Sequence, residues 1–145
     1  MPYEWVEDGV TSDATFRAFG TDLDELFTAA ADATTGLMVA EPETLAPAVT
    51  VPVTVTAPSL DLLLLRFLEE LVFEKDAHHL LLRATAVRVQ AAGSDGEARA
   101  EALLRGETID PSKHALATDV KAVTLHGLRV ERAGDHWEAQ VTLDV

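Results

Sequence analysis

The sequence predicts a single α+β domain, residues 1–145, in which two helices cover one face of a largely antiparallel sheet. Three observations lead to this fold class. The chain has 145 residues, a length that fits one domain. Two segments carry apolar residues at helical spacing, and the remaining segments alternate apolar and polar residues between turn signals. The expected order is strand, strand, helix, strand, helix and then four strands.

The N-terminal part predicts two strands and a helix. We expect strands over 2–6 and 14–20, separated by a polar turn at 7–13. Thr21 is a good N-cap for the helix that follows, and the acidic residues after it complement the positive helix N-terminus. Gly36 lies near the end of the apolar pattern and is expected to terminate this helix.

A third strand and a second helix follow a proline-containing loop at 41–47. Strict alternation predicts a strand over 48–57, and Pro52 favours an edge position because proline cannot donate to a neighbouring strand. Ser59 is expected to cap a helix that runs to about Lys75. The acidic residues of this helix are expected to face solvent: Glu69, Glu70 and Glu74.

The C-terminal half predicts two hairpins on either side of a polar, irregular segment at 106–119. The first hairpin turns at 93–96, where the sequence reads Gly-Ser-Asp-Gly, and the second turns at 133–135. The four strands are expected over 80–91, 97–105, 120–132 and 137–145.

The composition excludes several classes of protein. The chain has no cysteine, so disulfides, zinc–thiolate sites and thiol nucleophiles are ruled out. The formal net charge of −14 opposes binding to a phosphate backbone, so direct contact with nucleic acid is not expected. No nucleophile elbow, phosphate-binding loop or dinucleotide motif is present. We also find no signal peptide and no membrane-spanning segment, and we expect a cytoplasmic protein.

Carboxylates near the two ends of the chain form a candidate cation site. Asp13 lies at the start of a predicted strand, and Asp144 precedes Val145, whose main-chain carboxylate adds further oxygen ligands. Oxygen ligands select calcium, magnesium or manganese over zinc. These residues could share an ion only if the strands that carry them are neighbours.

Two histidines form a second candidate. His114 and His126 lie near Asp119 and Lys121 in the sequence, and histidine, carboxylate and lysine together can perform acid–base chemistry. A solvated, charged loop explains the same residues without any catalysis, and spacing alone favours that interpretation.

Three segments resemble the archease family over essentially the whole chain. Residues 10–20 are similar to its N-terminal His-Thr-Ala-Asp run, which precedes a strand ending in glycine. Residues 119–128, reading DVKAVTLHGL, resemble its Glu-Val-Lys-Ala-aliphatic-Thr-Tyr-His run. Residues 137–145 are similar to its Trp-x-x-x-Val-x-x-Asp-Val/Ile ending. Val10 stands where the family has histidine, and Ser12 stands where it has alanine.

The resemblance implies a function that the composition does not. Archeases are protein cofactors of the RtcB-type RNA ligase of tRNA splicing. They promote guanylylation of the ligase and its multiple turnover, and can alter its nucleotide specificity, without being enzymes themselves. The resemblance further implies a bound divalent cation, expected to be calcium, held by Asp13, Asp144 and Val145. It also implies a role in ligase activation for Lys121, with Asp119, His114 and His126 as accessory residues.

Two other functions remain open on the sequence. One is a stand-alone metal-dependent enzyme that uses Asp13, His114, His126 and Asp144. The other is a generic acidic chaperone, whose binding would not depend on Asp13, Lys121 or Asp144.

Overall fold

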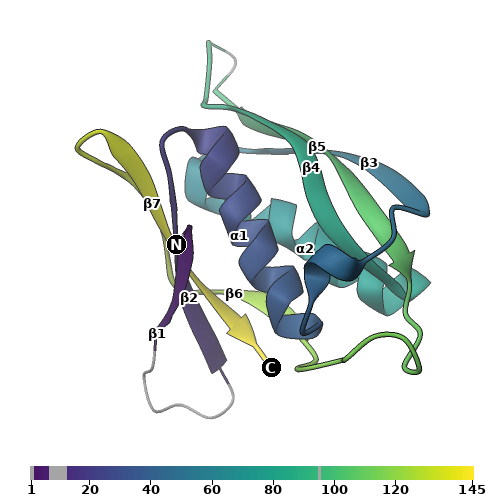
Figure 1. Cartoon of the computed structure of the whole chain (residues 1–145). Helices are drawn as coiled ribbons and strands as arrows, with labels where there is room; N and C mark the ends of the chain where they lie inside the picture. Colours follow the sequence, from purple (N-terminus) through teal and green to yellow (C-terminus); the bar gives the residue numbers. More distant parts are fainter. Residues whose placement is uncertain (1, 7–12, 95) are drawn as a thin grey trace.

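The computed structural model describes residues 2–6, 13–94 and 96–145. Within these ranges the strands form two antiparallel sheets, with the orders β1-β2-β7-β6 and β3-β5-β4 (Figure 1). The strands are β1 (Tyr3–Val6), β2 (Asp13–Gly20), β3 (Val49–Ala57), β4 (Leu80–Gln90), β5 (Ala98–Thr108), β6 (Ala122–Ala133) and β7 (His136–Asp144). The predicted turn at 7–13 lies outside the described residues except for Asp13, and Asp95 of the 93–96 turn also lies outside them.

The predicted α+β class with antiparallel strands is confirmed, and the strands divide into two sheets. Alternation in the sequence shows which residues of a strand face inward, but it does not specify which strand lies alongside. Proline at position 52 does carry positional information, because β3 lies at the edge of its sheet as expected.

The first helix, α1 (Leu23–Met38), begins one residue later than expected. Asp22, not Thr21, is the N-cap, and its Oδ1 accepts a hydrogen bond of 2.8 Å from the Glu25 amide. The Glu25 carboxylate in turn accepts from the amide and hydroxyl of Thr21. Gly36 does not end the helix, which continues for two further residues.

The second helix, α2 (Leu60–His78), extends past Lys75 to a left-handed C-cap at His79. One of its three predicted solvent-facing acids is buried. Glu74 is buried, not solvent-facing, and its Oε1 lies 2.7 Å from His78 Nδ1. Lys75 is also buried, with only 8% of its side chain exposed.

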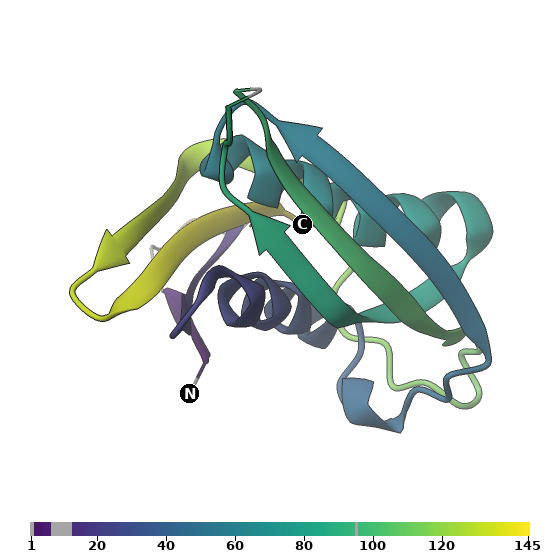
Figure 2. The same cartoon turned by 90° about the horizontal axis from the view of Figure 1, so that it is seen from above.

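Both helices contact both sheets, and the hydrophobic core lies between these layers (Figure 2). Phe27 of α1 and Phe67 of α2 are fully buried, and their ring centroids lie 5.6 Å apart. Phe16 and Val141 contribute from the first sheet, and Leu104 from the second. Burial on this scale accounts for the stability of the domain without a disulfide or metal.

Candidate functional site

The pairing of β2 with β7 brings the two ends of the chain together. Asp13, the first residue of β2, lies directly opposite Asp144, the last residue of β7. Side chains directly opposite one another on antiparallel strands lie on the same face, with Cβ atoms about 4.5–5.5 Å apart. The strands that carry the two predicted carboxylates are therefore neighbours, as a shared cation requires.

A hydrogen-bonded threonine pair fixes this register. Thr15 and Thr142 are the next pair on the same face, and their hydroxyl oxygens lie 2.8 Å apart in a buried setting. The Thr124 hydroxyl on β6 donates to the Thr142 carbonyl. Slipping either strand by one residue would separate the hydroxyls of Thr15 and Thr142 and would place the two aspartates on opposite faces of the sheet.

Lys121 lies at the same end of the sheet, immediately before β6. Its amide donates a hydrogen bond of 2.8 Å to the Asp144 carbonyl, so its backbone is attached to the strand that carries one of the aspartates. Its neighbour Val120 is fully buried, while Lys121 itself is exposed. The structure thus brings Asp13, Lys121, Asp144 and Val145 to one edge, which we call the carboxylate edge.

The charged side chains of this edge have no compensating partner among residues 2–6, 13–94 and 96–145. No side-chain hydrogen bond or ion pair from those residues reaches Asp13, Asp144 or Lys121. Two carboxylates, with the main-chain oxygens of Val145, supply the hard oxygen ligands that calcium and magnesium prefer. Within the described ranges, no cluster of three or more histidine, aspartate or glutamate side chains is arranged to hold a metal. Water or a partner could supply further ligands to a cation held by these oxygens.

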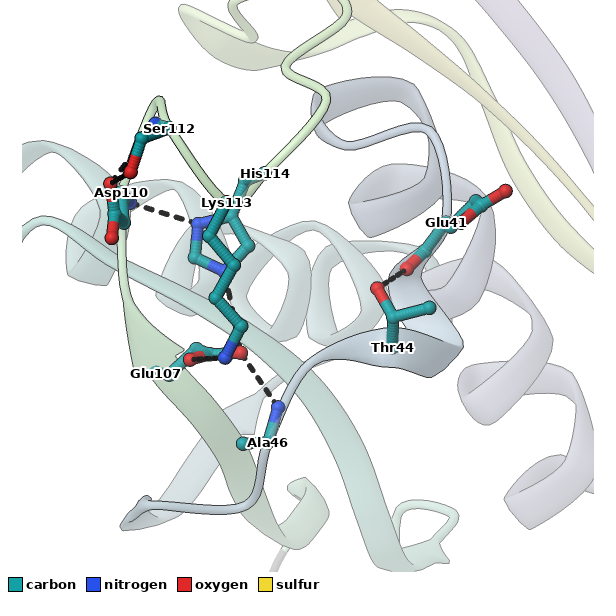
Figure 3. Close-up of polar contacts among 8 residues, drawn as sticks. All are labelled: Glu41, Thr44, Ala46, Glu107, Asp110, Ser112, Lys113 and His114. Atoms are coloured by element: carbon teal, nitrogen blue, oxygen red, sulfur yellow. Dashed lines mark hydrogen bonds and ion pairs between the residues drawn. The ribbon is translucent and has the colours of Figure 1, made fainter.

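His114 belongs to a different cluster, centred on Glu107 near the end of β5 (Figure 3). Its Nδ1 accepts a hydrogen bond of 2.8 Å from the Asp110 amide, so Nδ1 carries no proton and Nε2 carries it. Nε2 lies 3.3 Å from Glu107 Oε2, in a geometry poorer than that of a regular hydrogen bond. Only 2% of the histidine side chain is exposed, so this ring fills a structural position.

Glu107 has partners on both carboxylate oxygens. Lys113 Nζ donates to Oε1 at 2.6 Å, and the Ala46 amide donates to Oε2 at 2.7 Å. These two hydrogen bonds, that from Lys113 first, lower the pKa of Glu107 from 4.5 to about 2. The cluster joins the end of β5 to the loop before β3 and to the turn at 110–114.

The other two accessory candidates have different surroundings. His126 is exposed in an irregular part of β6, where the register with β7 shifts between Thr124 and Arg129. Asp119 accepts a hydrogen bond of 2.6 Å from Lys75 at the end of α2. The structure does not bring His114 and His126 together with the two aspartates, so the four residues do not form one site.

Lys75 is a functional candidate that the sequence did not reveal. Its ammonium donates to Asp119 and to Asp76, at 2.6 and 2.5 Å. Burial alone would lower the pKa of Lys75, but the hydrogen bonds and charges of Asp119 and Asp76 outweigh it and raise the pKa above its ordinary value.

These three residues line an open cavity of about 370 Å³ whose other walls include Met38, Leu81, Ile109 and Leu116. A lysine at a helix end is usually solvated, so the pattern carried no signal of burial.

Comparison with known proteins identifies the family. The model of the Archease protein family matches residues 3–145. A protein archease of Methanosarcina mazei is 31% identical over 99% of this chain and 95% of its own length. The corresponding protein of Pyrococcus furiosus is 32% identical over 98% of this chain and 99% of its own.

Two solved structures share the fold. The solution structure of a Methanobacterium thermoautotrophicum protein superposes with a TM-score of 0.83 at 30% identity, covering 99% of both chains. The crystal structure of a Thermotoga maritima archease, described as a possible chaperone, superposes at 0.58 with 16% identity, covering 97% of this chain and 98% of that one. Among the described residues no helix is long and apolar enough to cross a membrane. The extent of these matches shows that the chain belongs to the archease family.

Proposed function

We propose that this protein activates an RtcB-type RNA ligase by docking its carboxylate edge near the guanylylation site of the ligase. The proposal includes faster guanylylation, multiple turnover and a broader choice of nucleotide. Membership of the archease family supports the choice of partner. The carboxylate edge supports the choice of surface, because it gathers at one end of the sheet charges of both signs that have no ion-pair partner among the described residues.

One observation carries the proposal: Asp13 and Asp144 are paired across β2 and β7, and the Lys121 amide donates a hydrogen bond to the carbonyl of the same Asp144. Two carboxylates directly opposite each other on neighbouring strands repel, and a bound cation would offset this repulsion. Asp13, Asp144 and Val145 are the residues that would hold a divalent cation, which we expect to be calcium. A cation bound there would supply positive charge between the two carboxylates, which no ion pair among the described residues neutralises.

Lys121 would complement the cation. Its exposed ammonium could contact a phosphate of the nucleotide or an acidic residue of the ligase. Because its main chain is attached to Asp144, the Lys121 backbone would keep a fixed relation to the cation, with the ammonium within reach of the same site. Such preorganised positive charge stabilises phosphoryl transfer when it is directed at the charge that develops in the transition state.

The proposal is tested by single-turnover guanylylation of the purified ligase, with and without this protein. We expect a large increase in the rate constant on addition of the protein, and an increase in the number of RNA ends joined per ligase molecule. An unchanged rate at saturating concentration would contradict the proposal.

The same preparation separates the alternatives. Turnover of a substrate panel by this protein alone would indicate a stand-alone metal-dependent enzyme. Binding to the ligase that survives Asp13→Asn, Lys121→Ala and Asp144→Asn, and protection of the ligase from aggregation without faster guanylylation, would indicate a generic acidic chaperone.

A further inference from the structure

The segment that leads to Lys121 is held along its whole length. We call residues 115–121 the strap. Its first part runs beside the end of α1: the Ala40 amide donates to the Ala115 carbonyl, and the Ala117 amide donates to the Met38 carbonyl at 3.0 Å. The Thr118 amide donates to the Leu37 carbonyl at 2.9 Å. A segment fixed by main-chain bonds of this kind behaves as an extension of the neighbouring element.

The second part of the strap is fixed by side chains. Lys75 Nζ donates to Asp119 Oδ1 at 2.6 Å, which connects the end of α2 to the strap. Val120 is then fully buried, and Lys121 donates its amide to Asp144. Of these three successive residues, Asp119 is attached to α2, Val120 is buried in the core, and Lys121, the lysine of the carboxylate edge, is attached to β7.

The two acceptors of Lys75 differ in what they connect. Asp76 lies on α2 itself, next to Lys75, so its bond to the ammonium is local. Asp119 lies 44 positions away in the sequence, so its bond joins two elements. Both carboxylates are well exposed, with 57% and 68% of their side chains accessible. Neither is required to fill the core, and their contributions to position can be separated by substitution.

We infer that Lys75 is a positioning residue for Lys121: its buried ammonium holds Asp119, and thereby sets where the strap enters β6 and where the Lys121 ammonium lies. This inference rests on the proposed function only for its activity readout. A charge-assisted hydrogen bond from a buried ammonium is short and directional, so it restricts the strap more than an ion pair between two exposed side chains would. Lys75 itself is not expected to touch the ligase or the nucleotide.

The test compares Asp119→Asn with Asp76→Asn, two changes that each remove one carboxylate from the same ammonium. We expect Asp119→Asn to lower maximal stimulation of guanylylation roughly tenfold, because small displacements of an oriented group have large effects on rate. Asp76→Asn should stay within about twofold of wild type, since the connection to the strap remains. Equal losses in the two variants would overturn the inference, and so would wild-type stimulation by Asp119→Asn.

A double-mutant cycle separates positioning from general destabilisation. In a Lys121→Ala background, Lys75→Met should lower stimulation by no more than about twofold, because the group that Lys75 positions is already absent. In the wild-type background the same change should match Asp119→Asn. If Lys75→Met lowered stimulation by the same factor in the Lys121→Ala background as in wild type, the inference would be overturned.

Amide hydrogen exchange gives a readout that does not involve the ligase. The Lys121 amide should exchange faster in Asp119→Asn and Lys75→Met than in wild type or Asp76→Asn, while the amides of the β2–β7 ladder should be unchanged. Unchanged exchange at Lys121 in all variants would overturn the positioning role even if the protein activates the ligase. Faster exchange without any ligase stimulation by wild type would instead contradict the proposed function and leave the structural connection supported.

Discussion

The Glu107 cluster and the carboxylate edge contain similar charged residues, but they differ in whether those residues have partners within the protein. At the Glu107 cluster, the carboxylate accepts from Lys113 and the Ala46 amide, and the buried His114 accepts from the Asp110 amide. At the carboxylate edge, the charges of Asp13, Lys121 and Asp144 have no such partner among the described residues. The comparison separates charges that hold the fold together from charges that are available to something outside it.

The comparison predicts its largest effect for the two aspartates. Asp13→Asn and Asp144→Asn each keep the shape of the side chain and remove its charge. Stimulation of multiple-turnover ligation should be lost almost completely, because the cation would lose one of its charged ligands. Thermal melts should shift little, since neither residue contributes to the apolar core. A folded variant with full stimulation would show that the edge holds no functional ion.

Lys121→Ala should produce the next largest loss. The structure rules out Lys75 and Lys113 as simple charge controls, because both are held in ion pairs. Arg105→Ala is the better match: Arg105 is exposed on β5 and has no ion pair within the described ranges. Ligase turnover at saturating concentration of each variant should fall for Lys121→Ala and stay near wild type for Arg105→Ala. Equal behaviour would reduce Lys121 to part of a solvated surface.

Substitution of His114 should affect stability more than function. His114→Ala removes a buried ring that accepts from Asp110, and we expect a loss of about 2 kcal/mol in the free energy of unfolding. Lys113→Met, next to it in sequence but half-exposed, should cost less than about 1 kcal/mol. Urea unfolding measures both values. Stimulation per folded molecule should be retained by His114→Ala, and its selective loss would contradict a structural role.

We expect the smallest effect to be a pH dependence of the free energy of unfolding that is caused by Glu107. Its pKa is about 2 in the folded protein, below its ordinary value of 4.5, so its carboxylate form is favoured by folding. The resulting stability is present above pH 4.5 and is lost as the pH falls through about 2. Urea midpoints should therefore differ between wild type and Glu107→Gln at neutral pH, and this difference should shrink toward pH 2. A difference that stays constant with pH would contradict the assignment.

Much of the fold could be predicted from local pattern. The alternation of β3, the apolar stripe of α2 and the glycine turns between strands are short-range signals, and each of them indicated the correct element. The division into two sheets could not be predicted in this way, because strand partners are chosen by packing between distant segments. The burial of Glu74 was missed because burial depends on how α2 packs against distant segments, although its partner His78 lies on the same helix. The contact between Lys75 and Asp119 depends in the same way on how α2 and the strap pack.

The candidate site was predictable in part. Asp13 and Asp144 stood out because they occupy the start and end of strands, and the resemblance to archeases added Lys121. Their register opposite one another depends on β2 pairing with β7, which no local pattern encodes. His114 shows that residue type alone is weak evidence for a functional site. This histidine lies near acidic residues and a lysine in the sequence, but its ring is buried and structural. Val10 and Ser12, the two departures from the archease pattern, lie outside the described residues.

A calcium titration of the isolated protein by calorimetry tests the central contrast most directly. Wild type, Asp144→Asn and Glu107→Gln would be compared at neutral pH, with magnesium as a second cation. The account predicts one calcium site in wild type and in Glu107→Gln, and its loss in Asp144→Asn, because the ion is held at the carboxylate edge and the Glu107 cluster already has its partners. Calcium binding that persists unchanged in Asp144→Asn, or that disappears in Glu107→Gln, would contradict it.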